Sequence, residues 1–208
     1  MPGNLTGVKK TAKARPHHAP GGAASPRVSQ DAVSLLRADH TALRRLLSAL
    51  KSAPTPTQRQ RLLANTRQEL QAHTAIEEEI FYPAFRAAGR TKRDEQLFHE
   101  ATAEHHAAEL VLHEVGSADD AGEQFPGRAK VLKEIVEHHA REEETDMFPR
   151  ARELIGAAEL RSLGQQMADR KRALRRDHAG TESALAKVVK LVGLPFSGRA
   201  KATPQVGT

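Results

Sequence analysis

The 208-residue sequence contains no cysteine and no tryptophan, and its aromatic residues are one tyrosine and six phenylalanines. Without cysteine the chain can form neither a disulfide nor a thiolate metal site, and thiol catalysis is excluded. The same absence fits a reducing compartment. The shortage of aromatic residues predicts a modest core that is built mostly from aliphatic side chains.

A long apolar run is also missing. No segment approaches the roughly 20 apolar residues that a membrane-spanning helix needs. The N-terminal residues are basic but have no apolar centre, so they do not have the pattern of a secretory signal. We therefore expect a cytoplasmic protein without a membrane span.

The net charge of +6 is concentrated at the two ends of the chain. Residues 1–28 contribute +5 and residues 191–208 contribute +2, which leaves −1 for the residues between them. A basic tail can contact phosphates nonspecifically, but this composition is typical of a solvated, disordered segment. We expect no specific nucleic-acid partner. The basic residues of the first segment are Lys9, Lys10, Lys13, Arg15 and Arg27.

The region between the tails has the composition and periodicity of helices. Alanine, leucine, glutamate, arginine and glutamine dominate, and alternating β-branched runs are absent. Four stretches joined by short loops predict an all-α fold, an up-down antiparallel four-helix bundle with an additional C-terminal helix. The predicted helices span residues 30–52, 58–88, 93–115 and 128–155. The predicted organisation is a disordered tail over 1–28, the bundle over 29–156, the helical extension over 157–193 and a disordered tail over 194–208.

Several residues predict where these helices begin, bend or break. Ser29 is the expected N-cap of the first helix, and Thr57 with Gln60 forms a capping box for the second. Pro83 and the similarly placed Pro149 are expected to kink or end their helices.

The predicted C-terminal helix is amphipathic, and Gly180 should interrupt it. Its apolar stripe includes Leu160, Leu163, Met167 and Leu174 at spacings of three, four and seven residues, but Lys171 and His178 break the stripe. Two roles remain open for this helix. It packs on the bundle, the interpretation we favour, or it presents a surface for a partner or a second copy.

An internal repeat carries the residues of chemical interest. Residues 73–83 read HTAIEEEIFYP and residues 139–149 read HAREEETDMFP, with His, two Glu and Pro at the same places. Upstream, the segment around His40 resembles that around His105. The offsets are 65 residues for this pair and 66 for the repeat, which suggests a duplicated helical hairpin.

The spacing places a histidine and a glutamate on one face of a helix in each half. Residues four apart lie about 6 Å apart along the axis, so an imidazole and a carboxylate can reach one ion. Each of the four helices points one histidine toward its apolar face, and buried carboxylates are costly unless they are paired or bind metal. Nitrogen and oxygen donors without sulfur favour iron or manganese over structural zinc. The candidate metal ligands are His40, His73, Glu77, His105, His139 and Glu143.

The remaining histidines and acids are expected at the surface. His106 lies on a more polar helix face than its neighbour His105, and the repeat selects His139 over His138. The other glutamates of the runs 77–79 and 142–144 are expected to be mostly solvated. A less favoured alternative is that Glu78 and Glu144 support the ligands.

Together these motifs resemble the hemerythrin-like, HHE cation-binding family. The resemblance covers about residues 30–155 and includes the dipeptides Asp39-His40 and Glu104-His105 with the two repeated segments. It implies a four-helix bundle around two irons, in which the two glutamates match bridging carboxylates and the four histidines match terminal ligands. Oxygen-carrying hemerythrins have a second histidine one turn from the third-helix ligand, where this chain has Ala101 and Glu109. The resemblance thus implies either an iron poorer in histidine or an additional ligand in Glu109.

Three functions follow from such a centre. The first is binding of iron and a small ligand, namely dioxygen, nitric oxide or peroxide, for sensing, transport or storage. The second is an enzyme that decomposes peroxide or reduces nitric oxide. The third is a metal that only holds the helices together.

Overall fold

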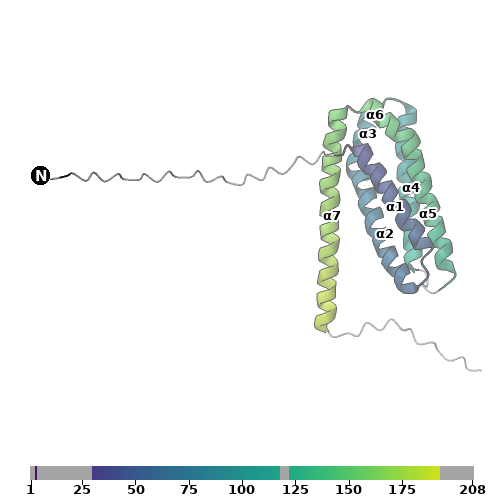
Figure 1. Cartoon of the computed structure of the whole chain (residues 1–208). Coiled ribbons are helices and arrows are strands. Elements are labelled where there is room, and N and C mark those ends of the chain that lie inside the picture. Colours follow the sequence, from purple (N-terminus) through teal and green to yellow (C-terminus); the bar gives the residue numbers. More distant parts are fainter. Residues whose placement is uncertain (1–2, 4–29, 118–121, 193–208) are drawn as a thin grey trace, which may run out of the picture.

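The computed structural model describes residues 3, 30–117 and 122–192, and for residues 179–192 it describes the backbone alone. All regular structure in these residues is helical (Figure 1). The elements are α1 (Ala32–Lys51), α2 (Pro56–Ile76), η1 (Glu77–Phe81), α3 (Tyr82–Ala88), α4 (Lys92–Ser117), α5 (Gln124–Glu142), η2 (Glu143–Met147), α6 (Phe148–Leu154) and α7 (Ala157–Val192). The predicted tails, residues 1–28 and 194–208, lie outside the described residues apart from residue 3.

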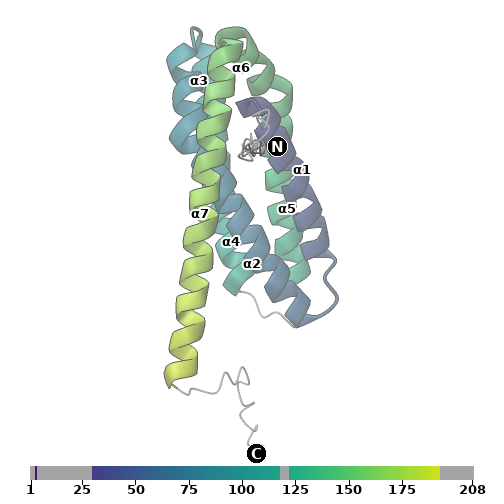
Figure 2. The same ribbon diagram turned by 60° about the vertical axis from the view of Figure 1, so that its left-hand side comes forward.

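The predicted up-down antiparallel bundle is confirmed. α1 packs against α2 and α5, and α4 packs against α5, so these helices form the four walls of the bundle. α3 and α6 continue α2 and α5 at one end of the molecule (Figure 1). α7 runs along the outside of α1 and α2, as both views show (Figures 1 and 2). The C-terminal helix therefore packs on the bundle, the role that the sequence favoured.

The observed helix starts differ from two of the predicted ones. The N-cap of α1 is Asp31, whose side chain accepts a hydrogen bond from the Ser34 amide at 2.8 Å. The helix begins after Ser29, which lies outside the described residues. α2 begins at Pro56 and is capped by Thr55, so the predicted Thr57 capping box is wrong. The reason is that proline fits the first helical turn, where its missing amide costs nothing.

The predicted interruption of the last helix at Gly180 is also wrong. α7 continues through this position to Val192. A single glycine costs a helix only about 1 kcal/mol relative to alanine, which neighbouring helix-forming residues can offset.

The two prolines at the predicted kinks each follow one wide turn of π-helix. η1 precedes Pro83 and η2 precedes Pro149, and each ends with an amide that bonds five residues back, to the carbonyl of Glu77 or Glu143. A proline inside a helix lacks an amide and clashes with the carbonyl four residues earlier. Widening the turn relieves this clash without ending the helix. The chain therefore continues into α3 and α6, and the inward-facing side chains of these helices no longer follow the regular spacing of α2 and α5.

Two apolar clusters fill the bundle, one toward each end. One cluster joins the start of α1 to the π turns, α3, α6 and α7, and includes Leu36 and Ile76. The other joins the end of α1 to α2, α4 and α5, and includes Leu43 and Leu70. His40 follows Leu36 by one turn and precedes Leu43, so a polar layer separates the two clusters. Within the described residues, no helix is long and apolar enough to cross a membrane.

Candidate metal centre

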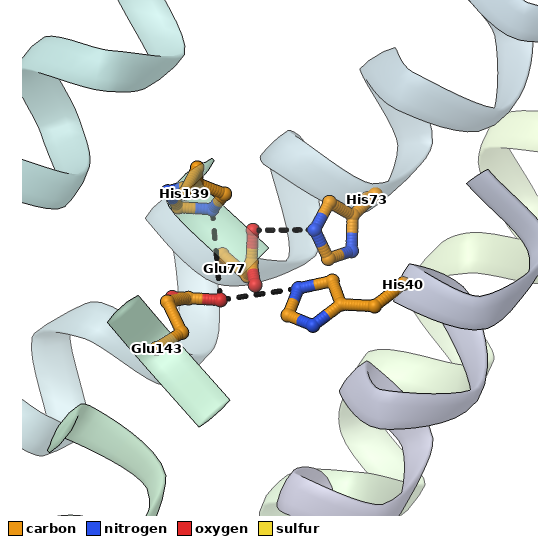
Figure 3. Close-up of side chains that lie close together, drawn as sticks. All are labelled: His40, His73, Glu77, His139 and Glu143. Atoms are coloured by element: carbon orange, nitrogen blue, oxygen red, sulfur yellow. Dashed lines mark ion pairs between the residues drawn. The ribbon is translucent and has the colours of Figure 1, made fainter. Parts of the chain in front are cut away.

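Six buried side chains from four helical passes form the polar layer inside the bundle. Each is at most 6% exposed. His40 comes from α1, His73 from α2, His105 from α4 and His139 from α5, while the two carboxylates stand at the first residues of the π turns. Figure 3 shows five of them converging, with Glu77 and Glu143 between the rings. The six are His40, His73, Glu77, His105, His139 and Glu143.

Each glutamate lies between two imidazoles from opposite halves of the chain. Oε2 of Glu77 lies 3.1 Å from Nε2 of His73 and 3.2 Å from Nε2 of His105. Oε2 of Glu143 lies 3.2 Å from Nε2 of His40 and 3.5 Å from Nε2 of His139 (Figure 3). Both carboxylates therefore span the gap between the histidines of the first half and those of the second.

The histidines themselves form two close pairs. The rings of His40 and His73 have centroids 4.9 Å apart, and those of His105 and His139 have centroids 4.6 Å apart. One pair comes from α1 and α2, and the other from α4 and α5. The two histidine pairs and the two carboxylates between them form a group of donors that could hold metal.

Several polar atoms that face the middle of this layer lack hydrogen-bond partners. Among the described residues, Nε2 of His40, Nε2 of His73, both oxygens of Glu77 and Oε2 of Glu143 are buried without a hydrogen bond. Buried polar atoms in proteins are almost always hydrogen-bonded, so a cluster of exceptions requires an explanation. Metal bound by these oxygen and nitrogen atoms would satisfy all of them at once.

Burial disfavours the charged forms of the groups in this layer, so it lowers the pKa of a histidine and raises that of a carboxyl group. It lowers the pKa of His73 to about 3. Burial and the charge of Glu143 raise the pKa of Glu77 well above its usual range. Burial also raises the pKa of Glu143, but His139 and His40 outweigh this effect and hold it well below its usual range. Without metal, one carboxyl group of this pair therefore keeps a proton, and a cation would take the place of that proton.

An acid lies behind each histidine, on the side away from the centre. Nδ1 of His40 lies 2.9 Å from Glu144, and Nδ1 of His105 lies 2.9 Å from Glu78. These two pairs cross between the halves of the repeat. With a proton on Nδ1, each ring presents the lone pair of Nε2 to the centre, which is the form that binds metal.

The other two pairs stay within one half. Nδ1 of His139 lies 3.0 Å from Glu104, whereas Nδ1 of His73 lies 3.8 Å from Asp39. Asp39 and Glu104 directly precede the histidines His40 and His105, so all four supports follow the repeat. We expected Glu78 and Glu144 to be mostly solvated. Glu78 is indeed 45% exposed and Glu144 is 21% exposed, yet each lies with one oxygen against a histidine, in agreement with the alternative that the sequence favoured less.

Sequence reasoning missed Tyr82, which reaches the same layer. Its hydroxyl donates a hydrogen bond to Oε1 of Glu143 at 2.9 Å and lies 3.2 Å from Nε2 of His105. Its pKa is raised by burial and by the charge of Glu143. Regular helical spacing from Glu77 does not predict that Tyr82 points inward, because the π turn adds a residue between them. Pro83, which follows Tyr82, was the one sign in the sequence that the helix departs from regular geometry here.

Glu109, the possible additional ligand, is exposed and is not among the buried donors. It lines a groove between α2 and α4 with a volume of about 480 Å³. The buried edge of the groove includes His105, and its other polar walls include Gln71, Thr74 and Thr102. The groove therefore brings the surface close to one histidine pair, that of His105 and His139.

The fold and this layer define an all-α bundle with a buried site of nitrogen and oxygen donors. The model of the hemerythrin HHE cation binding domain matches residues 31–151. The chain belongs to this family, as the sequence motifs predicted.

Solved and curated relatives are similar over most of the chain. A crystal structure of a hemerythrin HHE cation binding domain-containing protein from Mycobacterium kansasii, the homologue of Rv2633c, has a TM-score of 0.63 and 30% identity, covering 82% of this chain and 95% of that one. The uncharacterized protein Rv2633c of Mycobacterium tuberculosis is 30% identical over 150 residues, which is 70% of this chain and 88% of the relative. A DNA nickase of Nostoc is 25% identical over 114 residues, 55% of this chain and only 31% of that protein.

Proposed function

We propose that the protein binds two iron ions in the polar layer and presents them to a small ligand such as dioxygen, nitric oxide or peroxide. The observation that carries the proposal is the placement of Glu77 and Glu143, each between imidazoles of both histidine pairs. In the proposed centre, His40 and His73 would hold one ion, His105 and His139 would hold the other, and Glu77 and Glu143 would contribute carboxylate oxygens to both. The six donors contain nitrogen and oxygen but no sulfur, which favours iron among the common redox metals.

The chain's own residues prepare the layer for this role. The acids behind His40, His105 and His139 favour Nδ1 as the protonated nitrogen, so these three Nε2 atoms are oriented before a metal arrives. Apolar side chains on both sides exclude water from the layer. Bound iron would supply a Lewis acid and an electron donor or acceptor.

The two ions would stand in different surroundings. The groove between α2 and α4 reaches the edge of His105, and the hydroxyl of Tyr82 lies beside the same ring. At the corresponding place in the other half, the ring of Phe148 stacks on His40 with centroids 5.6 Å apart. We therefore assign entry of the small ligand to the side of His105.

An enzyme that decomposes peroxide or reduces nitric oxide is the second candidate. Tyr82 favours it, because its hydroxyl is a buried O–H donor hydrogen-bonded to one of the proposed bridging carboxylates. A proton held at this atom could pass to a ligand bound nearby. A centre that only stabilises the bundle is the third candidate, and neither the groove nor Tyr82 is needed for it.

The test begins with the metal content of the purified protein. We expect close to two irons per chain in the wild type and much less in Glu77→Gln and Glu143→Gln. Glu79→Gln is the matched control, because Glu79 lies in the same π turn but pairs with Arg170 at the surface. Wild-type protein that takes up no transition metal, or equal iron content in all four proteins, would contradict the proposal.

The loaded protein then separates the three candidates. It is mixed in turn with dioxygen, nitric oxide and hydrogen peroxide. A visible band that forms with a ligand and reverses on degassing indicates a carrier or sensor. Evolution of oxygen from peroxide or steady consumption of nitric oxide indicates an enzyme. A centre that reacts with none of them, and whose removal unfolds the bundle, indicates a structural role.

A further inference from the structure

Lys171 is a buried lysine on the side of α7 that faces the bundle. It is 7% exposed and continues the stripe formed by the buried residues Leu160, Leu163 and Met167. A buried ammonium group is costly unless acids lie close to it. The interruption of the apolar stripe at this position therefore requires a polar partner inside the molecule.

That partner is the acid behind His73. Nζ of Lys171 lies 2.6 Å from Oδ2 of Asp39 on α1 and 3.3 Å from Oε2 of Glu69 on α2. The same Oδ2 atom of Asp39 is the one that lies 3.8 Å from Nδ1 of His73. A continuous chain of charged and polar groups thus runs from α7 through α1 to a candidate metal ligand on α2.

The corresponding acid in the other half meets no lysine or arginine among the side chains that the structure describes. Glu104 lies 3.0 Å from Nδ1 of His139 through one oxygen and 3.3 Å from Nε2 of His138 through the other. The side chain of His138 is 55% exposed. Among the described residues, Asp39 alone of the four supporting acids is held by a buried lysine, and it makes the longest contact with its histidine.

The lysine also lies outside the part of the chain that defines the family. The family model ends at residue 151, and α7 begins at Ala157. The six proposed ligands and their four supporting acids all lie within residues 31–151. Through Lys171, α7 adds a group to the support of His73 from beyond that region.

We propose that Lys171 is a positioning residue of the metal centre, which holds the Asp39 carboxylate behind His73 and so makes α7 a part of the centre. This inference rests on the proposed binding of iron. Without the ammonium group, Asp39 loses its nearest cation and is free to turn away from the ring. His73 then loses the carboxylate that lies 3.8 Å from its Nδ1, and the metal it holds should leave faster.

The experiment measures how fast iron leaves the loaded protein for an excess of a strong chelator. We expect Lys171→Met to release part of its iron roughly tenfold faster than the wild type, the lower end of the effect of removing an outer support. Lys171→Arg should restore slow release, because it returns the cation. Arg170→Gln is the matched control, because Arg170 is the neighbouring residue on α7 and pairs with Glu79 instead.

A double variant tests whether the lysine acts through Asp39. Asp39→Asn should release iron faster by itself, and adding Lys171→Met to it should cause no further change. This non-additivity is expected only if both residues belong to one chain of contacts. The double variant also removes both buried charges, so it leaves no unpaired ion to unfold the protein.

The outcomes separate the inference from the proposed function. Wild-type protein that binds no iron ends both. Iron binding with equal release rates in wild type, Lys171→Met and Arg170→Gln overturns the role of Lys171 and leaves the function standing. Lys171→Met and Arg170→Gln could instead release iron equally fast and lose equal free energy of unfolding. That result would mean that Lys171 only helps α7 to pack on the bundle, and it would also overturn the inference.

Discussion

Tyr82 and Phe148 occupy equivalent positions in the two halves of the repeat, yet only one of them offers a hydrogen bond to the centre. Each directly follows a π turn and lies over a histidine, with ring centroids 5.4 Å apart for Tyr82 and His105 and 5.6 Å apart for Phe148 and His40. The hydroxyl of Tyr82 donates to Glu143. The two halves thus repeat the same helix and π turn, but they place a hydroxyl beside His105 and an apolar ring beside His40.

Replacing Tyr82 by phenylalanine should make the two halves more alike. In the metal-free protein, Oε1 of Glu143 would lose its donor, and a buried acceptor without a partner costs about 1–3 kcal/mol. We expect the free energy of unfolding to fall by about this amount in urea titrations of Tyr82→Phe. An unchanged stability would show that the hydroxyl contributes no net hydrogen bond.

The acids Glu78 and Glu144 should contribute similarly to metal binding, because they support His105 and His40 at the same distance. Glu78→Gln and Glu144→Gln are expected to weaken iron binding by roughly 10- to 100-fold each, the range seen when the outer partner of a metal-binding histidine is removed. Competition with a chelator of known affinity measures the effect. Glu79→Gln, next to Glu78 but paired with Arg170, should bind iron as the wild type does.

The stability of the metal-free protein should fall as the pH rises above about 6.5. The pKa of Glu77 is raised by burial and by Glu143, so the folded protein keeps a proton that the unfolded chain has already lost. Burial lowers the pKa of His139, but Glu143 and Glu104 outweigh it and raise the net value, which acts in the same direction. Each such group lowers the free energy of unfolding by at most about 1.4 kcal/mol per pH unit, until its folded pKa is passed.

The pKa of His73 acts in the opposite direction and at lower pH. Because burial lowers it to about 3, the unfolded chain binds more protons between that value and about 6.5, and stability rises with pH there. Urea titrations of metal-free protein at about pH 6.5 and about pH 8 isolate the upper range. Glu77→Gln should flatten the fall over that range. A fall of the same slope in this variant would rule out Glu77 as its source.

A methyl group at Gly164 should separate α7 from the start of α1. A Cβ at this position would clash with the carbonyl oxygen of Gln30 and lie 2.8 Å from the amide nitrogen of Ala32, both of which are backbone atoms. We expect Gly164→Ala to lower the free energy of unfolding by about 1–3 kcal/mol, the usual cost of overpacking.

Gly127, in the first turn of α5, provides the control for this substitution. A Cβ there meets nothing within 4 Å. Gly127→Ala should leave stability unchanged or raise it by up to about 1 kcal/mol through helix propensity. Thermal unfolding followed by circular dichroism compares the two variants. Equal stabilities would mean that α7 can shift at no cost.

The bundle and the burial of the six candidate ligands could be predicted from the sequence, because both depend on helical periodicity. His105 is buried and His106 exposed, and His139 is buried while His138 is largely exposed, as the apolar faces of their helices indicate. Each histidine follows the period of its own helix, so local spacing is enough to orient it. Whether these six residues bind metal stays a proposal that the metal content will test.

Features that depend on local departures from regular helix, or on distant contacts, could not be predicted in this way. Tyr82 faces the centre because η1 contains one residue more per turn than an α-helix. Lys171 broke a clear pattern in the sequence, but its partner Asp39 lies on a helix far away along the chain. Helix propensity alone also misjudged Gly180, where the helix continues.

The crossed pairs of histidine and acid have a consequence for the origin of the molecule. His40 depends on Glu144, and His105 depends on Glu78, so each hairpin lends an acid to the other and neither can support both of its own rings alone. If one ancestral hairpin was duplicated to give this chain, that ancestor could have formed these contacts only as a symmetric pair of identical chains. Fusion of the two copies would then have freed positions 82 and 148 to carry different residues, Tyr82 and Phe148. It would also have allowed a later helix, α7, to pack on α1 and α2 of one half alone.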